Sequence, residues 1–149
     1  MAVEKAARRR HHLVILRGPY LDAILAGCKT IESRFTVTRR AYWGRILCGD
    51  RLFLKQSSGP VCATVKVLKV RYYENLTPQQ IELLKGQYNQ QIKGADDYWQ
   101  GKSNCRYGVL VWLGDVRHIK PVWIEKRDWR AWVVLGEKEN FGLLGAQSG

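Results

Sequence analysis

Short apolar runs, several with a two-residue alternation, recur along this chain and predict a fold built mainly of β-strands. Residues 13–17 form a continuous apolar run that ends at Arg17, which is typical of a buried strand. In residues 30–35 the polar Thr30, Glu32 and Arg34 face one way and the intervening residues face the other. Further strands are predicted at residues 51–55, 61–71, 107–113, 116–119, 122–124 and 129–135, with Pro121 marking an edge strand or a bend.

Two segments have the periodicity of helices instead. After Pro19, which suits a first helical turn, apolar residues at 21, 24 and 25 share one face, and Gly27 provides a left-handed stop. The second helix begins at Thr77, which forms a capping box with Gln80, and it ends near Gly94. The chain therefore contains two main helices among its strands.

These elements predict one small α+β domain, a closed or nearly closed mixed β-barrel of about six strands. The domain is expected to span residues 13–135. Residues 1–12 are expected to be a basic flexible arm, and residues 136–149 a C-terminal tail. Residues 96–106 are polar and are expected to form a loop or an irregular lid.

The charge balance narrows the class of partner. The chain carries 25 Lys and Arg against 13 Asp and Glu, a formal net charge of +12. This excess favours an anionic partner, most simply nucleic acid, although a well-solvated basic surface would have the same composition. No apolar run approaches the roughly 20 residues of a membrane helix, and residues 1–12 lack the apolar stretch of a signal peptide. We therefore expect a soluble intracellular protein, cytoplasmic or nuclear, with no membrane partner.

The cysteines do not indicate a metal site or a cofactor. None of the four is part of a Cys-x-x-Cys pair, and none has zinc-finger spacing to histidine. The chain also lacks a Ser-His-Asp order, a glycine-rich phosphate loop and a His-Glu-x-x-His motif. We expect no metal and no cofactor.

The densest chemistry lies in residues 27–34, which read Gly-Cys-Lys-Thr-Ile-Glu-Ser-Arg. Lys29, Glu32 and Arg34 could form a recognition corner, with the cations on phosphate and the carboxylate on a base amino group or a sugar hydroxyl. The alternative is an internal salt bridge that pins helix to strand. The candidates for catalysis are Lys29, Thr30 and Glu32, but Glu32 would stabilise the Lys29 ammonium and oppose its use as a base.

Two other groups of residues are candidates for binding. Basic and aromatic side chains alternate at Arg39, Arg40, Tyr42, Trp43, Tyr98, Trp99 and Lys102, as single-stranded or flipped nucleotides require. These rings could equally be core residues at the barrel ends. Lys55, Ser57 and Ser58 could bind a phosphate or a base edge, or form only a hairpin turn. The remaining tryptophans of the predicted strands, Trp112, Trp123, Trp129 and Trp132, are interpreted as packing residues.

The helix that ends Gly-x-Lys, followed by Glu and Arg two residues apart, resembles the signature of the ASCH domain family. Here these residues are Gly27, Lys29, Glu32 and Arg34, and the turn at residues 49–52 resembles the family too. The resemblance extends over residues 13–135, including the aromatic-rich strand at 107–113. It implies a PUA-like β-barrel with a cleft between barrel and helices, and a role in handling RNA or modified nucleosides.

One branch of this family consists of small amidohydrolases that remove the acetyl group from acetylcytidine. Their signature Lys corresponds to Lys29, but their Thr three residues later is replaced by Glu32. Their essential Glu has Glu74 and Glu82 as candidates here. Another branch is described as ribonuclease-like and relies on Lys, Tyr and Ser.

We therefore expect a binding cleft for RNA or a modified nucleotide, with single-stranded DNA as an open alternative. The expected floor is Lys29, Glu32, Arg34 and Lys55, and the expected walls are Tyr42 or Trp43 and Tyr98 or Trp99. A small hydrolase of the same fold and a protein-interaction domain are the rival hypotheses. The sequence leaves catalysis and the oligomeric state open.

Overall fold

A computed structural model describes residues 10–146 of the chain, and within them it contains six strands and four helices. The strands are β1 (His11–Leu16), β2 (Ile31–Thr36), β3 (Arg51–Gln56), β4 (Val61–Tyr73), β5 (Tyr107–Val122) and β6 (Trp132–Val134). The helices are α2 (Gly18–Leu25), α3 (Pro78–Ile92), α4 (Asp96–Gln100) and α5 (Leu143–Ala146). Most of the predicted basic arm, residues 1–9, and the end of the predicted tail, 147–149, lie outside the described residues.

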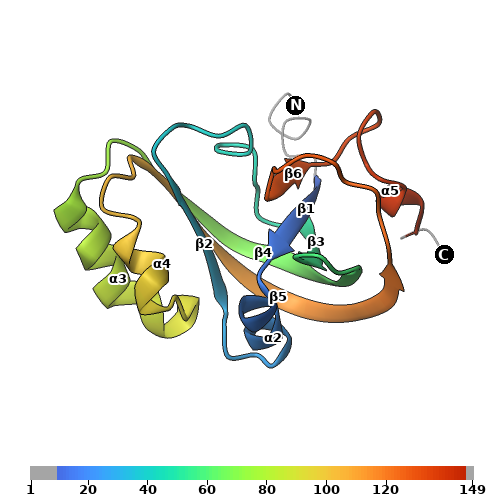
Figure 1. Cartoon of the computed structure of the whole chain (residues 1–149), viewed down its shortest axis with the longest axis horizontal. Helices are drawn as coiled ribbons and strands as arrows, with labels where there is room; N and C mark the ends of the chain where they lie inside the picture. Colours follow the sequence, from blue (N-terminus) through green and yellow to red (C-terminus); the bar gives the residue numbers. More distant parts are fainter. Residues whose placement is uncertain (1–9, 147–149) are drawn as a thin grey trace, which may run out of the picture.

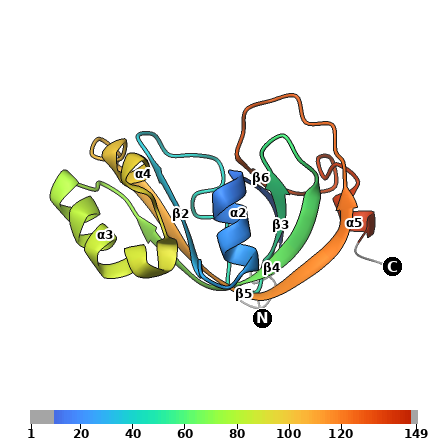
Figure 2. The same cartoon turned by 60° about the horizontal axis from the view of Figure 1, so that its bottom comes forward.

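All the strands belong to one curled sheet with the order β2-β5-β4-β3-β1-β6. β1 pairs with β3 in parallel, and the other pairs are antiparallel. The sheet bends into a half-barrel in which β2 and β6 remain as edges, with α3 and α4 beside β2 at one end (Figures 1 and 2). The predicted α+β, PUA-like fold is confirmed, with an opening between the two edges where a closed barrel would have continuous pairing.

The bend depends on the two longest strands, β4 and β5. Their pairing shifts register at three places between Val61 and Lys69, and such bulges increase the local twist and curvature of a sheet. The prediction of two short strands on either side of Pro121 was wrong, because β5 runs through to Val122. Pro121 is tolerated because it lies in the irregular interval between the pairings of His118 and Val122.

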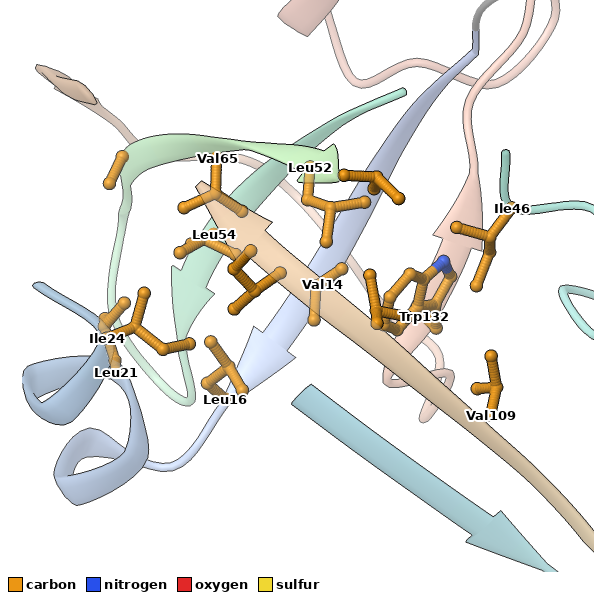
Figure 3. Packing of buried hydrophobic residues seen from close by; sticks show 14 residues of the cluster. Val14, Leu16, Leu21, Ile24, Ile46, Leu52, Leu54, Val65, Val109 and Trp132 are labelled. Atoms are coloured by element: carbon orange, nitrogen blue, oxygen red, sulfur yellow. The ribbon is translucent and has the colours of Figure 1, made fainter. Parts of the chain in front are cut away.

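Three apolar clusters hold the sheet and helices together. The largest fills the inside of the half-barrel beneath α2 and includes Leu21 and Ile24 of that helix together with Val14, Leu54 and Trp132 (Figure 3). A second cluster fixes α3 and α4 against β2 and β5. The third lies beside β1 and β3 and includes the fully buried Leu143 of α5, so the segment after β6 returns to the sheet.

Local sequence signals explain where the helices begin and end. The Thr77 hydroxyl accepts a hydrogen bond from the Gln80 backbone N–H, and the Gln80 side chain accepts one from the Thr77 N–H, which is the predicted capping box. Gly27 has the predicted left-handed backbone after α2. The end of α3 differs, because Lys93 rather than Gly94 is the left-handed residue. None of the described helices has the length and apolar character of a membrane span.

Candidate functional site

The opening of the half-barrel lies between β2 on one side and β1 with β6 on the other. Three backbone carbonyls of these edge strands accept hydrogen bonds from side chains instead of from a neighbouring strand. Arg34 Nη2 donates to the Ile15 oxygen at 3.0 Å, Lys29 Nζ to the Ile31 oxygen at 2.9 Å, and the Tyr98 hydroxyl to the Ser33 oxygen at 3.1 Å. Charged and polar side chains therefore satisfy the backbone groups of the edges that face this opening.

Glu32 lies at the centre of these side chains and is almost fully buried, with 6% of its surface exposed. Its Oε1 lies 3.2 Å from Lys29 Nζ and accepts from the Ser33 N–H. Its Oε2 accepts from Arg34 Nε at 3.1 Å and Nη2 at 2.8 Å. The carboxylate thus accepts three hydrogen bonds from the protein and forms an ion pair with Lys29, so the internal salt bridge considered from the sequence is present.

Lys29 has no unused donor. Its Nζ donates to the carbonyl oxygens of Ile31 and Ile92 and contacts Glu32, which accounts for the three N–H groups of an ammonium. Only 3% of the residue is exposed. Lys29 therefore acts as a fixed cation that joins the end of α3 to β2, and it presents no lone pair that could abstract a proton.

The opposite charges of Glu32 and Arg34 keep both side chains ionised although both are buried. Burial alone would raise the pKa of Glu32, but the charges of Arg34 and Lys29 outweigh it and hold this pKa below its ordinary value. Burial would likewise lower the pKa of Arg34, and the Glu32 carboxylate more than compensates and raises it. Glu32 and Arg34 consequently stay ionised as a buried pair.

Arg34 retains the two N–H donors of its Nη1 nitrogen. No described residue accepts a hydrogen bond from its Nη1, although Nε and Nη2 are both used. The guanidinium also lies over the Trp132 ring, 5.5 Å from the ring centre, and Trp132 stacks on Tyr42 at 5.4 Å. Arg34 is therefore fixed in place and still able to donate to an anionic or carbonyl oxygen of a ligand.

A buried chain of hydrogen bonds holds the Trp132 ring in place. Its Nε1 donates to His12 Nδ1 at 3.1 Å, and His12 Nε2 donates to Asp50 Oδ2 at 2.8 Å. Burial raises the pKa of Asp50, but the hydrogen bonds from His12 and from backbone N–H groups outweigh it and lower this pKa overall. His12 belongs to β1, one residue inside the predicted arm, and its role could not be seen without the pairing of β1 and β6.

Around Arg34 the opening widens into a cavity of about 710 Å³. Its lining includes six cationic side chains and one carboxylate, namely Arg17, Lys29, Arg34, Arg40, Lys102, Arg130 and Glu32. It also includes six aromatic rings, namely Tyr20, Phe35, Tyr42, Tyr98, Trp129 and Trp132. Cations and rings in one cavity suit a ligand that is both anionic and planar.

The structure brings only some of the predicted site residues to this cavity. Those that line it are Lys29, Glu32, Arg34, Arg40, Tyr42, Ser57, Tyr98 and Lys102. Those that do not are Thr30, Arg39, Trp43, Lys55, Ser58 and Trp99. Of each predicted pair of wall residues, the tyrosine lines the cavity and the tryptophan does not.

Both excluded tryptophans have structural partners. Trp43 Nε1 donates to the carbonyl oxygens of Tyr73 and Gly108, and the guanidinium of Arg39 covers the Trp43 ring. Trp99 is buried in the cluster beneath α3. Neither ring is available to a ligand in the cavity.

The other predicted residues lie elsewhere for simple reasons. Thr30 is exposed just before β2, and Lys55 donates to the neighbouring Gln56 carbonyl in the β3–β4 turn. Glu74 and Glu82, the candidates for an essential glutamate, are exposed and do not line the cavity. Among the described residues, Glu32 is thus the only carboxylate in the cavity lining.

Among the cationic and aromatic residues of the lining, sequence reasoning missed six: Arg17, Tyr20, Phe35, Trp129, Arg130 and Trp132. The interpretation of Trp123 and Trp129 as packing residues was wrong, because they are 73% and 100% exposed. A signal was present, since residues 125–130 are a charged run in which an apolar ring has few neighbours to pack against. Within residues 10–146, no three His, Cys, Asp or Glu side chains are grouped as metal ligands.

Comparison with known proteins identifies relatives of this fold. A family model described as the ASCH domain matches residues 14–112. The ASCH structure from Zymomonas mobilis superposes with a TM-score of 0.69 at 13% identity, covering 93% of this chain and 96% of that one. Variants of the same Zymomonas mobilis protein give TM-scores of 0.67 (Ser to Ala; 16% identity, 93% and 96% coverage) and 0.65 (Tyr to Phe; 16%, 92% and 98%). No curated protein matches the sequence.

Proposed function

Because the chain belongs to the ASCH domain family, which is generally RNA-binding within the PUA-like superfamily, we propose that its cavity binds RNA or a modified nucleotide. The observation that carries the proposal is the composition of the cavity. Six cations and six aromatic rings surround a single carboxylate, and that carboxylate is already saturated by protein donors. The uncompensated charge in the cavity is positive.

The geometry divides the roles among the residues. Arg34 supplies its free Nη1 to a phosphate or a base carbonyl oxygen, and Glu32 orients Arg34 rather than contacting the ligand. Tyr42 and Tyr98 provide ring surface on opposite segments of the lining. Arg40 and Lys102 form no ion pair with any described residue, so their charge is available to phosphates.

The test uses fluorescence anisotropy of a short labelled single-stranded RNA, with DNA of the same sequence as a second ligand. Arg40→Gln combined with Lys102→Gln removes two cations from the cavity. Lys85→Gln combined with Lys120→Gln removes two cations that do not line it and serves as the matched control. Each lost phosphate contact lowers the slope of log affinity against log salt by about 0.7 for a single strand, so the first variant should lower it by about 1.4.

The control variant should change the slope little. Equal changes in both double variants would mean that RNA binds anywhere on the basic surface, and the cavity assignment would fail. If the folded wild type binds no RNA or DNA, the proposal itself is wrong. Circular dichroism establishes that every variant is folded.

One observation favours a second candidate, a hydrolase of the same fold acting on RNA or on an acylated nucleoside. The Ser33 and Tyr98 hydroxyls lie 2.8 Å apart at the cavity wall, near Lys29. Burial, however, raises the pKa of Tyr98 well above its usual value, so the phenol donates but does not act as a base. Turnover of RNA or acetylcytidine that is lost in Ser33→Ala would favour the hydrolase over a binding module.

A further inference from the structure

The loop between β5 and β6, residues 123–131, presents an indole that no other described side chain covers. Trp129 is 100% exposed, and no hydrogen bond, ion pair or ring contact joins its side chain to another described residue. The five other rings of the cavity lining each contact at least one neighbouring ring. Trp129 is thus the one ring of the described lining that packs against no other ring.

The backbone that carries Trp129 is nevertheless tied down on both sides. Lys126 Nζ donates to the Asp128 carbonyl at 2.8 Å and to its carboxylate at 2.7 Å. The Arg130 backbone N–H donates to the same carboxylate at 2.9 Å, and its guanidinium also pairs with Asp128 and Glu139. Trp129 is therefore exposed on a loop whose backbone is held by hydrogen bonds and ion pairs.

The charges around the ring indicate what it faces. Arg130 is neutralised by its two carboxylates, whereas Arg40, on the loop after β2, lines the same cavity without an ion-pair partner among the described residues. Arg127, next but one to Trp129, pairs with Glu125 at 3.5 Å, so it adds no unpaired charge. An exposed ring that lines the same cavity as the unpaired cation Arg40 matches a nucleobase joined to phosphate.

We propose that Trp129 is a second stacking platform, which takes the nucleotide next to the one held at Arg34, so that the ligand is a single strand of at least two nucleotides. The proposal rests on the proposed function of the cavity and specifies its ligand. Tyr42 and Tyr98 serve the first base inside the cavity, and Trp129 serves the second at the cavity's edge. A mononucleotide then leaves Trp129 uncovered.

The experiment measures the affinities of mononucleotides and of short oligoribonucleotides for the wild type, Trp129→Ala and Trp123→Ala by calorimetry. Trp123 is the matched control, because it is an exposed tryptophan at the start of the same loop and does not line the cavity. Loss of one stacked base should weaken oligonucleotide binding by Trp129→Ala roughly 5- to 150-fold. Mononucleotide affinity should stay within about twofold of wild type, because stacking on Trp129 begins with the second base.

The remaining outcomes overturn the proposal in distinguishable ways. If the wild type binds oligonucleotides and Trp129→Ala binds them equally well, the cavity function stands and the platform does not. If Trp123→Ala loses as much affinity as Trp129→Ala, the effect belongs to the whole loop. If the wild type sediments as a dimer and Trp129→Ala as a monomer, with equal RNA affinity, Trp129 contacts a second copy of the chain instead of RNA. Failure of the folded wild type to bind either ligand would reject the cavity function itself.

Discussion

Glu32 explains why so many charges are buried at the opening of the half-barrel. A carboxylate removed from water is costly, and here its cost is offset by two cations and a backbone N–H at once. The two cations in turn satisfy carbonyl oxygens of β1, β2 and α3. The residue is therefore structural in the first place, and in the proposed function it holds Arg34 in position for the ligand.

Replacing Glu32 by Gln should destabilise the protein by about 3–5 kcal/mol at neutral pH, because it leaves two buried cations without an anion. Glu82→Gln, an exposed glutamate on α3, is the control and should change stability by less than about 0.5 kcal/mol. Urea unfolding measures both. An equal effect in the two variants would contradict the charge cluster as described.

The stability difference between the wild type and Glu32→Gln should depend on pH in a defined direction. The pKa of Glu32 is lowered in the folded protein from its ordinary value of 4.5, so its contribution is fully present above that pH. The contribution declines as the pH falls from 4.5 toward the folded-state pKa, because the unfolded chain binds the proton first. The stability difference between wild type and Glu32→Gln should therefore shrink below that pH and stay constant above it.

At the scale of elements, the junction between α3 and α4 sets the wall of the cavity. Gly94 follows the left-handed Lys93, and its N–H donates to the Asn89 side chain, which also accepts from Trp99 Nε1. A Cβ at Gly94 would lie 2.7 Å from Trp99 Nε1 and 2.9 Å from Tyr98 Cδ2. The bare backbone there allows the two aromatic residues of α4 to pack closely.

Gly94→Ala should therefore push Tyr98 away from Ser33, cost about 1–3 kcal/mol of stability through overpacking, and weaken RNA binding. Gly86→Ala is the matched control, since Gly86 lies inside α3 with nothing within 4 Å of the added Cβ. It should stabilise the protein by about 1 kcal/mol and leave affinity unchanged. Normal RNA affinity in Gly94→Ala would remove Tyr98 from the binding wall.

These elements also show what the sequence could predict. The start of α3 followed from Thr77 and Gln80 because a capping box is a local device. The choice between Tyr98 and Trp99 could not follow, because it depends on α4, a helix of 5 residues that is too short to show periodicity. The sequence also could not predict that Trp129 is exposed and Trp132 buried. Strand β6 pairs over only three residues, and its register is set by β1, which is far away in the sequence.

At the scale of the molecule, the proposed site lies at the unclosed edge of the barrel. The sheet order leaves the outer edge of β2 without a neighbouring strand (Figure 1). Lys29, Arg34 and Tyr98, which bond to carbonyl oxygens of β1 and β2 at this opening, also line the cavity. The corner around residues 27–34 could be predicted from its charge density, and the opposite wall could not, because β1 and β6 join it only through folding. The net charge of +12 gives this opening an anion-attracting field.

The most direct test of ligand binding in the cavity is to follow the Arg34 side chain during a titration. Nitrogen-15 NMR of the arginine Nε–H groups, assigned with Arg34→Lys, would be recorded during titration with a mononucleotide and with a short RNA. The buried Nε of Arg51 does not line the cavity and serves as an internal reference. We predict that the Arg34 signal shifts with both ligands while the Arg51 signal stays in place. An unchanged Arg34 signal under saturating RNA would show that the ligand does not bind at Arg34.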